Sequence, residues 1–389
     1  MLAAAAAIGE TETVATEAAL GRVLAADLIS GVDVPPLDNA QMDGYAVRCT
    51  DVPSVPARLP VALRVAAGHA AGVLAPGSAA RIFTGAPIPQ GGDAVVMQED
   101  ARAEHGAVWL HRQPQPGQWI RRAGSDVRRG AVALPAGQAL AAQHLGVAAS
   151  VGAARVSVVR RPRVALLCTG DELTAPGQPL PEGGIYNSNR YMLAGLLESL
   201  GCAVRDLGVV RDSRQETLQA LQEAARQSDL ILSSGGVSVG EEDHVRAALQ
   251  SAGELSWWSI AMRPGKPLAF GRVGTVPFIG LPGNPVSSFV GFALFVRPFL
   301  LRLLGARAAG PLAVPVQANF RFPADAERRS FLRARIGQDG GVELAASQNS
   351  AVLTSLAQAD GLVDLPAGTS VEPGQIVRFL PLALLAGPP

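Results

Sequence analysis

The sequence predicts a multidomain α/β protein, in which a doubly wound parallel sheet is combined with β-rich domains and a C-terminal β-barrel. Three observations predict this fold class. The chain has 389 residues, more than one hydrophobic core usually holds, so we expect two to four domains. Strand-like and helix-like segments alternate between residues 163 and 305. The segments before and after this region contain short strands between turns.

Composition excludes several classes of protein. Hydrophobic residues make up 48% of the chain and charged residues 17%, which excludes intrinsic disorder and a coiled coil. The 33 basic and 33 acidic residues cancel, so no net charge favours nucleic acid as a partner. The chain has no uninterrupted run of about 18 apolar residues, so no membrane span is expected.

The location is predicted from the N-terminal segment and the cysteines. The apolar start lacks a basic region and reaches Glu10 early, so it does not predict a signal peptide. Cys49, Cys168 and Cys202 have no CxxC spacing, which disfavours a zinc site or a disulfide scaffold. We therefore expect a soluble protein of the cytoplasm.

The first 160 residues predict mainly short strands. Pro and Gly recur between apolar runs such as 61–65 and 94–97, a spacing typical of strands joined by turns. A strand and turn, a short helix near Gln143 and a further strand at 154–159 follow. The run Arg160–Pro162 then marks a boundary.

Residues 163–305 predict the doubly wound sheet. Asn187 or Ser188 can cap one helix, and Asp212 or Ser213 can cap the next. Short apolar strands that alternate with helices are typical of a parallel sheet. The expected strands are 164–168, 203–210, 229–234, 268–273 and 276–281, and a long apolar helix is expected from about 285 to 304.

The helical pattern stops after Gly310. Strands expected at 314–320, 329–336, 361–366 and 375–379 fit a small β-barrel or sandwich, and we predict the barrel. The predicted domains are an elongated linker domain of residues 1–29 and 131–161, a β-rich domain of 30–130, an α/β domain of 162–310 and a β-barrel of 311–389.

A phosphate-binding loop is predicted at one edge of the sheet. Ligands of doubly wound sheets bind beyond the carboxyl ends of the strands. The loop at 233–243 lies there and is rich in Gly and Ser, whose N–H and hydroxyl groups can bind phosphate. It lacks the GxxxxGK[ST] order of a P-loop, and a capped strand-to-helix turn is the alternative. Three further segments share this edge: 168–173, Asp212 and 281–287.

Three carboxylates are expected beside this loop: Glu172, Asp212 and Asp243. Carboxylates that converge next to a phosphate site indicate Mg²⁺, which prefers oxygen ligands and substrate phosphates. Each carboxylate taken alone is more typical of a helix cap, so the prediction depends on their convergence.

Other polar groups indicate sites for anions. Asn284 and Pro285 suit the start of a helix, whose free N–H groups attract an anion. Arg263 and Lys266 flank a rigid Pro-Gly turn and form a candidate oxyanion clamp, with a solvated turn as the alternative. The five histidines show no metal-binding spacing, and the chain has no GxSxG motif of a serine hydrolase.

Seven segments occur in a recognisable order: MDGYAV, RIFTGAPIPQGGDAVVMQED, TGDEL, IYNSNR, SSGGVSVGEEDH, MRPGKP and LPGNPVSS. Together they resemble the molybdopterin molybdenumtransferases, the MoeA family that includes the E domain of gephyrin. The resemblance runs from about residue 21 to 304 and continues weakly to the C-terminus. Two departures concern charge: Ser259 stands where the family often has Lys, and Gly124-Ser125-Asp126 stands where it has GED.

The resemblance implies a function in molybdenum cofactor biosynthesis. The expected reaction is the Mg²⁺-dependent insertion of molybdate into adenylylated molybdopterin, with release of AMP. The family's elongated, four-domain homodimer places its cleft between the sheet domain of one subunit and the β-rich domain of the other. A molybdopterin-adenylylating protein and molybdoenzyme chaperones are the expected partners, and nucleic acid and membranes are not.

The resemblance also implies roles for individual residues. Glu172, Asp212 and Asp243 would form the acidic group, with Glu172 and Asp243 as Mg²⁺ ligands. Asp43 and Thr84 would reach the cleft from the partner subunit as further catalytic residues. The positions implied to bind molybdopterin are Gly235, Gly236, Ser238, Pro264, Lys266, Pro282, Asn284 and Arg121. Those implied to bind molybdate are Arg263, Lys266, Arg333 and Ser350.

Two other functions stay open. One is a non-catalytic scaffold, because the gephyrin E domain also binds receptor peptides. The other is a hydrolase of a different pyrophosphate or nucleotide, for which the sheet domain alone would suffice. The motifs MDGYAV and TGAP of the β-rich domain disfavour that hydrolase.

Overall fold

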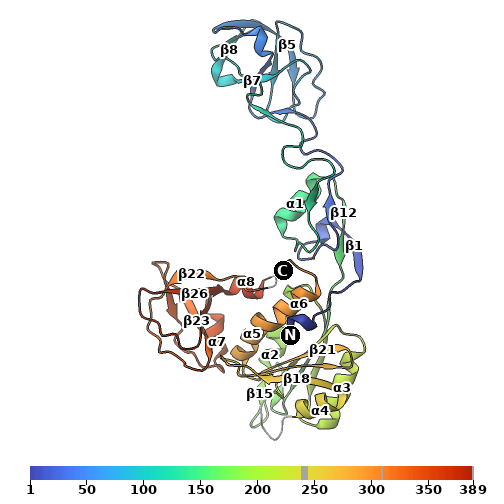
Figure 1. Cartoon of the computed structure of the whole chain (residues 1–389), viewed down its shortest axis with the longest axis vertical. Helices are drawn as coiled ribbons and strands as arrows, with labels where there is room; N and C mark the ends of the chain where they lie inside the picture. Colours follow the sequence, from blue (N-terminus) through green and yellow to red (C-terminus); the bar gives the residue numbers. More distant parts are fainter. Residues whose placement is uncertain (238–243, 308–309, 388–389) are drawn as a thin grey trace.

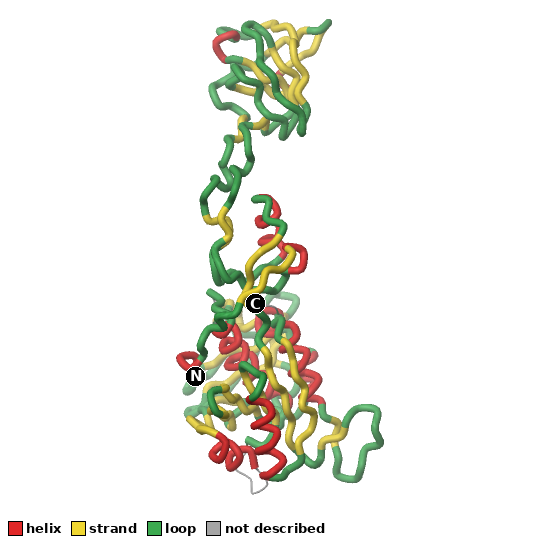
Figure 2. Tube along the Cα trace, turned by 90° about the vertical axis from the view of Figure 1, so that its right-hand side faces the viewer, coloured by secondary structure: helices red, strands yellow, loops and turns green. Residues whose placement is uncertain are grey.

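The computed structural model describes residues 1–237, 244–307 and 310–387, which form an elongated molecule (Figure 1). A β-rich lobe, here called the distal lobe, lies at one end. A narrow neck made mostly of loop joins it to the middle of the molecule (Figure 2). The opposite end, here called the base, contains the sheet that begins at residue 163 and the C-terminal strands. The mixed α/β, multi-sheet class predicted from the sequence is confirmed.

One six-stranded sheet forms the distal lobe, in the order β7-β4-β6-β5-β9-β8. Small and β-branched side chains such as Ala46, Ile82 and Val95 fill its core. The strands are short because turns interrupt the apolar runs, as the sequence predicts. Their bounds are β4 (Gly44–Val47), β5 (Ala57–Val65), β6 (Ala79–Ile82), β7 (Ala94–Met97), β8 (Ala101–Glu104) and β9 (Ala107–Leu110), with 3₁₀ turns η3 (Cys49–Asp51) and η4 (Gln98–Asp100).

The middle of the molecule and the neck join segments that are distant in sequence. The N-terminal segment pairs with the segment after residue 130, so the chain leaves at about residue 30 and returns near residue 131. The domain bounds given above stay a prediction. The pairs are β1 (Thr11–Ala15) with β12 (Arg155–Val159), β2 (Leu28–Ile29) with β11 (Val132–Leu134), and β3 (Asn39–Ala40) with β10 (Ile120–Arg121); the helices are η1 (Leu2–Ala4), η2 (Thr16–Ala18) and α1 (Ala142–Ser150).

The base contains a six-stranded sheet of order β16-β13-β17-β21-β20-β18. Four strands, β16 (Ala203–Val210), β13 (Arg163–Thr169), β17 (Leu230–Ser234) and β21 (Val276–Leu281), run parallel, as predicted. The sheet is not parallel throughout, because β20 (Pro267–Val273) and β18 (Gly253–Ser259) are antiparallel to their neighbours. Only two residues join β20 to β21, and a parallel crossover needs about a dozen or more.

Helices cover both faces of this sheet. Side chains of β13 alternate: Val164 and Leu166 pack with α2 (Ser188–Ser199), while Ala165 and Leu167 pack with α3 (Arg214–Ala225) and α4 (His244–Ala252). The predicted long apolar helix runs as α5 (Pro285–Gly291), the π-helical η5 (Phe292–Val296) and α6 (Arg297–Leu303). It is long and apolar enough to cross a bilayer, but 83% of it is buried in the protein, as in a core helix.

The C-terminal strands form a further sheet of order β19-β23-β25-β26-β22, with β24 paired to β23. β19 (Met262–Arg263) comes from the α/β region and pairs in parallel with β23, so it ties the two parts of the base together. Closure into a barrel stays a prediction. The remaining elements are β14 (Leu173–Thr174), β15 (Ile185–Tyr186), β22 (Val314–Gln317), β23 (Arg329–Ile336), β24 (Val342–Leu344), α7 (Leu353–Ala357), β25 (Gly361–Leu365), β26 (Ile376–Pro381) and α8 (Leu382–Ala386).

Candidate active site

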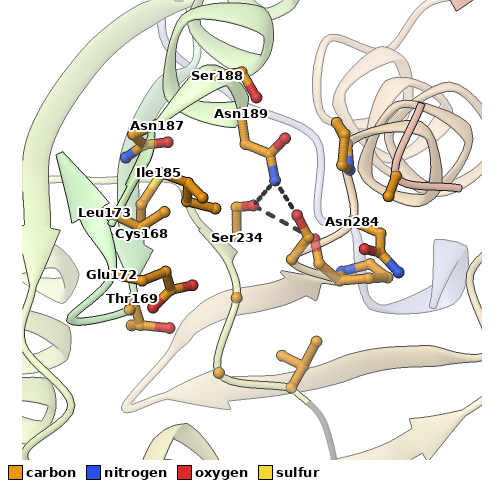
Figure 3. Close-up of a pocket in the computed structure, with 18 of the residues that line it drawn as sticks. Cys168, Thr169, Glu172, Leu173, Ile185, Asn187, Ser188, Asn189, Ser234 and Asn284 are labelled. Atoms are coloured by element: carbon orange, nitrogen blue, oxygen red, sulfur yellow. Dashed lines mark hydrogen bonds between the residues drawn. The ribbon is translucent and has the colours of Figure 1, made fainter. Parts of the chain in front are cut away.

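A cavity of about 630 Å³ opens at the carboxyl ends of β13 and β17 (Figure 3). The strand order reverses here, because β16 lies on one side of β13 and β17 on the other. Such a switch point is where doubly wound sheets bind ligands. All four predicted edge segments reach the cavity, and the predicted site residues that line it are Glu172, Asp212, Gly235, Gly236, Pro282 and Asn284.

Gly235 and Gly236 bring the loop after β17 close to the end of β13. Their φ angles are +88° and +66°. A Cβ at Gly235 would lie 2.5 Å from the Thr169 carbonyl oxygen, and one at Gly236 would lie 2.3 Å from Val245 Cγ2. The Gly235 N–H donates to the Leu281 carbonyl (3.0 Å), which fixes the loop to the end of β21. The close approach therefore requires glycine. Ser238, Glu241, Glu242 and Asp243 lie outside the described residues.

We expect Gly236→Ala to damage substrate binding more than folding. The new Cβ would meet Thr169 Oγ1 at 2.6 Å in addition to Val245, so the loop that lines the cavity or these neighbours must shift. The positive φ adds roughly 1–2 kcal/mol of strain. The KM for the substrate should rise at least about tenfold, the equivalent of about 1.4 kcal/mol. Gly283→Ala is the control, because Gly283 lines the same cavity and no atom lies within 4 Å of the point that its new Cβ would occupy. Equal KM values for the two variants would contradict the prediction.

Three buried polar atoms at the cavity have no hydrogen-bond partner among the described residues: Thr169 Oγ1, Asn187 Nδ2 and Asn189 Oδ1. Asn189 is nevertheless fixed, since its Nδ2 donates to Ser234 Oγ (2.9 Å) and to the Gly283 carbonyl (2.7 Å; Figure 3). An unpaired buried polar group costs about 1–3 kcal/mol, so a ligand that bonds to these atoms offsets that cost. The arrangement fits a polar ligand.

These three side chains were not predicted as ligand-binding residues. Asn187 was expected only as a helix cap, and it does cap α2 by accepting from the Arg190 N–H (3.1 Å). The available signal was the pair of asparagines in IYNSNR, directly after a strand and before a helix. Spacing alone does not distinguish a cap from a ligand.

The acidic group contains Asp171, which was not predicted from the sequence. Asp171 and Asp212 are linked by two hydrogen bonds, in which each backbone N–H donates to the other carboxylate (3.3 and 3.2 Å). Burial raises the pKa of Asp212, and the charges of Asp171 and Glu172 raise it further. The hydrogen bond from the Asp171 N–H and the electrostatic effect of His244 lower the pKa of Asp212 and oppose this shift. The neighbouring negative charges therefore oppose the ionisation of Asp212, and a bound cation would relieve this cost.

The residues present fit Mg²⁺. No group of three or more His, Cys, Asp or Glu among the described residues is arranged to hold a metal ion by itself. Mg²⁺ is usually bound by only one or two carboxylates together with substrate phosphates. Glu172 and Asp212 line the same cavity as the Gly loop, so they could hold Mg²⁺ against a phosphate.

A second polar centre lies beside the cavity, in the C-terminal sheet. Arg333 is 1% exposed, and its guanidinium donates to Ser355 Oγ and to the carbonyls of Ser347 and Asn349 (3.0–3.2 Å). No carboxylate among the described residues forms an ion pair with it. Burial, together with the charge of Arg263, lowers the pKa of Arg333 to about 10. A buried cation without a counter-ion is costly, and a bound anion would offset that cost.

The loop that carries Asn284 contacts this second centre. Asn284 Nδ2 donates to Ser350 Oγ (3.1 Å), and the Val286 N–H donates to the Ser350 carbonyl (3.1 Å). The residues predicted to bind molybdate therefore lie next to the cavity, but they do not line it in the described part of the chain. This applies to Arg263, Lys266, Arg333 and Ser350, and also to Pro264, which is buried.

Asp43 and Thr84 come together, but far from the cavity. Asp43 Oδ1 accepts from the Thr84 N–H and from Thr84 Oγ1 (both 2.8 Å). Both residues adjoin strands of the distal lobe, and Arg121 lies on β10 next to that lobe, whereas the cavity lies in the base (Figure 1). One chain therefore does not bring them to Glu172 and Asp212.

Comparisons with known proteins agree with this architecture over the whole chain. Residues 1–152 match the MoeA N-terminal region (domain I and II), residues 165–302 a probable molybdopterin binding domain, and residues 315–382 the MoeA C-terminal region (domain IV). A solved structure of the molybdopterin biosynthesis MoeA protein from Pyrococcus horikoshii is 29% identical, with a TM-score of 0.86 over 98% of this chain and 97% of that chain.

Curated relatives are enzymes. The molybdopterin molybdenumtransferase of Nostoc is 40% identical over 96% of this chain and 89% of that protein. The molybdopterin molybdenumtransferase of Haemophilus influenzae is 44% identical over 77% of this chain and 74% of that protein. The identity, its coverage and the three matched regions support the resemblance drawn from the sequence motifs. The chain belongs to the MoeA family of molybdopterin molybdenumtransferases, enzymes of molybdenum cofactor biosynthesis.

Proposed function

We propose that this protein inserts molybdate into adenylylated molybdopterin in a Mg²⁺-dependent reaction that releases AMP. The observation that carries the proposal is the pairing of two sites of opposite charge. An acidic group with a Gly loop faces the cavity. Arg333, which has no counter-ion among the described residues, lies beyond the Asn284–Ser350 contact. This arrangement suits a substrate with a phosphoanhydride at one end and an oxyanion that must approach it.

The roles of the residues follow from their positions. The loop of Gly235 and Gly236 binds and orients the polar part of molybdopterin, together with the atoms of Thr169 and Asn189 that lack partners in the described part of the chain. Glu172 and Asp212 would hold Mg²⁺, which would supply positive charge to polarise the phosphoanhydride.

Molybdate is the second substrate, a doubly negative oxyanion that other anions in the cleft would repel. Arg333 and Arg263 offset this repulsion, and the Asn284–Ser350 contact fixes the distance between the two sites. Fixed donors cost little reorganisation during the reaction, which is why such preorganised groups accelerate it.

The direct test is release of AMP from adenylylated molybdopterin, with and without molybdate and Mg²⁺. Release that requires Mg²⁺ and is stimulated by molybdate, with a metal-bearing product, is the expected result. Release that is independent of molybdate would instead favour a hydrolase. No release by folded protein would favour a scaffold.

We also propose that the active assembly is a homodimer, in which Asp43 and Thr84 of one subunit complete the cavity of the other. The distance between the distal lobe and the base supports this proposal (Figure 1). Within one chain, Asp43 and Thr84 lie at the end of the molecule opposite to the cavity. Closure of the C-terminal sheet into a barrel, a cytoplasmic location, and exchange with an adenylylating protein and molybdoenzyme chaperones belong to the same proposal.

Mixing two inactive variants tests the shared site. Asp43→Ala and Asp212→Asn should each be inactive as homodimers. After unfolding and refolding together in equal amounts, half of the dimers are mixed and each has one intact site, so activity should return to about a quarter of the wild-type value. Asp212→Asn mixed with Glu172→Gln is the control, because both changes fall in the same half of the site and no intact site forms. No recovery in the first mixture would contradict the shared site.

A further inference from the structure

Arg81 lies between the two segments that carry Asp43 and Thr84. It is on β6, which pairs antiparallel with β4 so that Tyr45 lies opposite Arg81. Asp43 immediately precedes β4, and Thr84 follows β6 by two residues. Because the strands are antiparallel, the start of β4 meets the end of β6, and the two segments emerge side by side.

The guanidinium of Arg81 donates hydrogen bonds on the Asp43 side of this junction, to Gly44 and to Gln98. Nη1 donates to the Gly44 carbonyl (3.2 Å), and Nη2 donates to Gln98 Oε1 (2.8 Å). The Gln98 N–H in turn donates to the Asp43 carbonyl (3.0 Å). The backbone on either side of the Asp43–Gly44 bond is therefore held by Arg81, directly at Gly44 and through Gln98 at Asp43.

Aromatic rings fix the guanidinium itself. Its carbon lies 5.2 Å from the centre of the Tyr45 ring and 4.8 Å from that of Phe83, the residue before Thr84. Arg64 lies over the same Phe83 ring at 4.8 Å, but among the described residues it donates no hydrogen bond to the Asp43 segment. Within the same described part of the chain, neither arginine forms an ion pair with a carboxylate. Arg81 thus contacts both segments, and Arg64 contacts only one.

The charge of Arg81 acts on the same carboxylate. Two hydrogen bonds from Thr84 lower the pKa of Asp43, and the positive charge of Arg81 lowers it further by a smaller amount. The Thr84 hydrogen bonds and the charge of Arg81 therefore both favour the ionised form of this carboxylate.

We propose that Arg81 is a positioning residue of this enzyme: it clamps the Asp43 segment to the Thr84 segment, so that the pair meets the partner's cavity in one orientation. The inference rests on the proposed function, in which Asp43 and Thr84 act across the dimer. Arg81 need not touch the substrate. A misplacement of about 1 Å at a reacting centre costs roughly 100-fold in rate, so its loss should reduce turnover more than affinity.

Three variants of the full-length protein test the clamp: Arg81→Gln, Arg81→Lys and the matched control Arg64→Gln. We expect kcat for AMP release to fall roughly 10- to 100-fold in Arg81→Gln, with KM within about twofold of wild type. Arg81→Lys keeps the charge but has a single donor nitrogen in place of the guanidinium fork, so it should recover part of the loss. Arg64→Gln removes an equal charge from the same ring and should leave kcat within about twofold of wild type, since a cation–π contact at an exposed site is weak.

Amide hydrogen exchange supplies a readout that does not depend on activity. The Thr84 N–H is protected by its bond to Asp43 Oδ1, so a peptide covering residues 83–88 should exchange faster in Arg81→Gln and unchanged in Arg64→Gln. Equal kcat in the two Gln variants, or unchanged exchange in Arg81→Gln, would overturn the proposal. Faster exchange across all strands of the distal lobe would show a general loss of stability and would also overturn it. If wild-type protein releases no AMP, the proposed function fails, whereas a selective change at residues 83–88 still supports the clamp.

Discussion

Asp212→Asn is expected to reduce AMP release on the order of 10²- to 10³-fold, the loss typical when one preorganised electrostatic partner is removed. The amide keeps the size of the side chain and an oxygen that can accept from the Asp171 N–H, so the change removes mainly the charge. Without Asp212, one of the two carboxylates proposed to hold Mg²⁺ is lost. Turnover at saturating Mg²⁺ is the measurement.

In the absence of Mg²⁺, Asp212→Asn should be at least as stable as the wild type. The folded-state pKa of Asp212 is raised, so above that pKa the charged form destabilises the folded protein relative to the unfolded chain. Removing the charge at neutral pH should therefore leave the melting temperature unchanged or raise it, while the stabilisation by added Mg²⁺ becomes smaller. In the wild type this stabilisation should decline as pH falls through the raised pKa, because protonation of Asp212 competes with the cation.

Glu216→Gln is the matched control for Asp212→Asn. Glu216 is an exposed residue in the first turn of α3, the helix that follows Asp212, and the change removes the same charge outside the cavity. It should leave turnover and the effect of Mg²⁺ at wild-type values. Full turnover in Asp212→Asn, or an equal loss in both variants, would show that the acidic group is not part of the active site.

Arg333→Met is expected to abolish the stimulation of AMP release by molybdate, with a loss of about 2.7–4 kcal/mol of transition-state stabilisation. Arg333 is fully buried, has no carboxylate partner among the described residues and has a lowered pKa. Its charge therefore disfavours the folded state until an anion binds. Molybdate at 100 times its dissociation constant would stabilise the wild type by about 2.7 kcal/mol, and this stabilisation should be absent in the variant.

Arg335→Met separates this effect from a general loss of charge. Arg335 lies on the same strand, is exposed, and donates to Gln358 through Nε and Nη2 (2.6 and 2.9 Å). We expect this variant to keep the molybdate-dependent rise in melting temperature. The decisive measurement is a thermal melt with and without molybdate for both variants. Persistence of the rise in Arg333→Met would assign Arg333 a purely structural role, through its bonds to Ser355, Ser347 and Asn349.

Several features of the site were predictable because they are local. The loops that follow apolar strands had to meet at one edge of a doubly wound sheet, which was enough to place Glu172, Asp212 and the Gly pair together from the sequence. The antiparallel direction of β20 could also have been predicted from the sequence. Only two residues lie between 273 and 276, and these are too few for a crossover connection between parallel strands. There the alternation of strands and helices outweighed the length of the connection in our prediction.

Other features depend on which atoms are left unpaired, and a linear pattern carries no such information. Asn187 looks like a helix cap in the sequence and Asn189 like an ordinary residue of the first turn, and only packing reveals their buried atoms that lack partners among the described residues. Arg333 looks like any strand arginine until burial among neutral groups is seen. The role of Asp171 was also hidden in the sequence, because its hydrogen bond to Asp212 joins residues that are 41 positions apart.

The sequence by itself determined the family, the parallel core of the sheet and the edge at which its ligand site forms, because these follow from local periodicity and from ordered motifs. Only the tertiary structure decided three further points: that Arg333 is a cation without a counter-ion among the described residues, that Arg81 donates to the Gly44 carbonyl next to Asp43, and that the Asp43–Thr84 pair lies far from the cavity of its own chain. The physical reason is that burial, charge pairing and distance are set by contacts between segments remote in sequence, which no local pattern encodes.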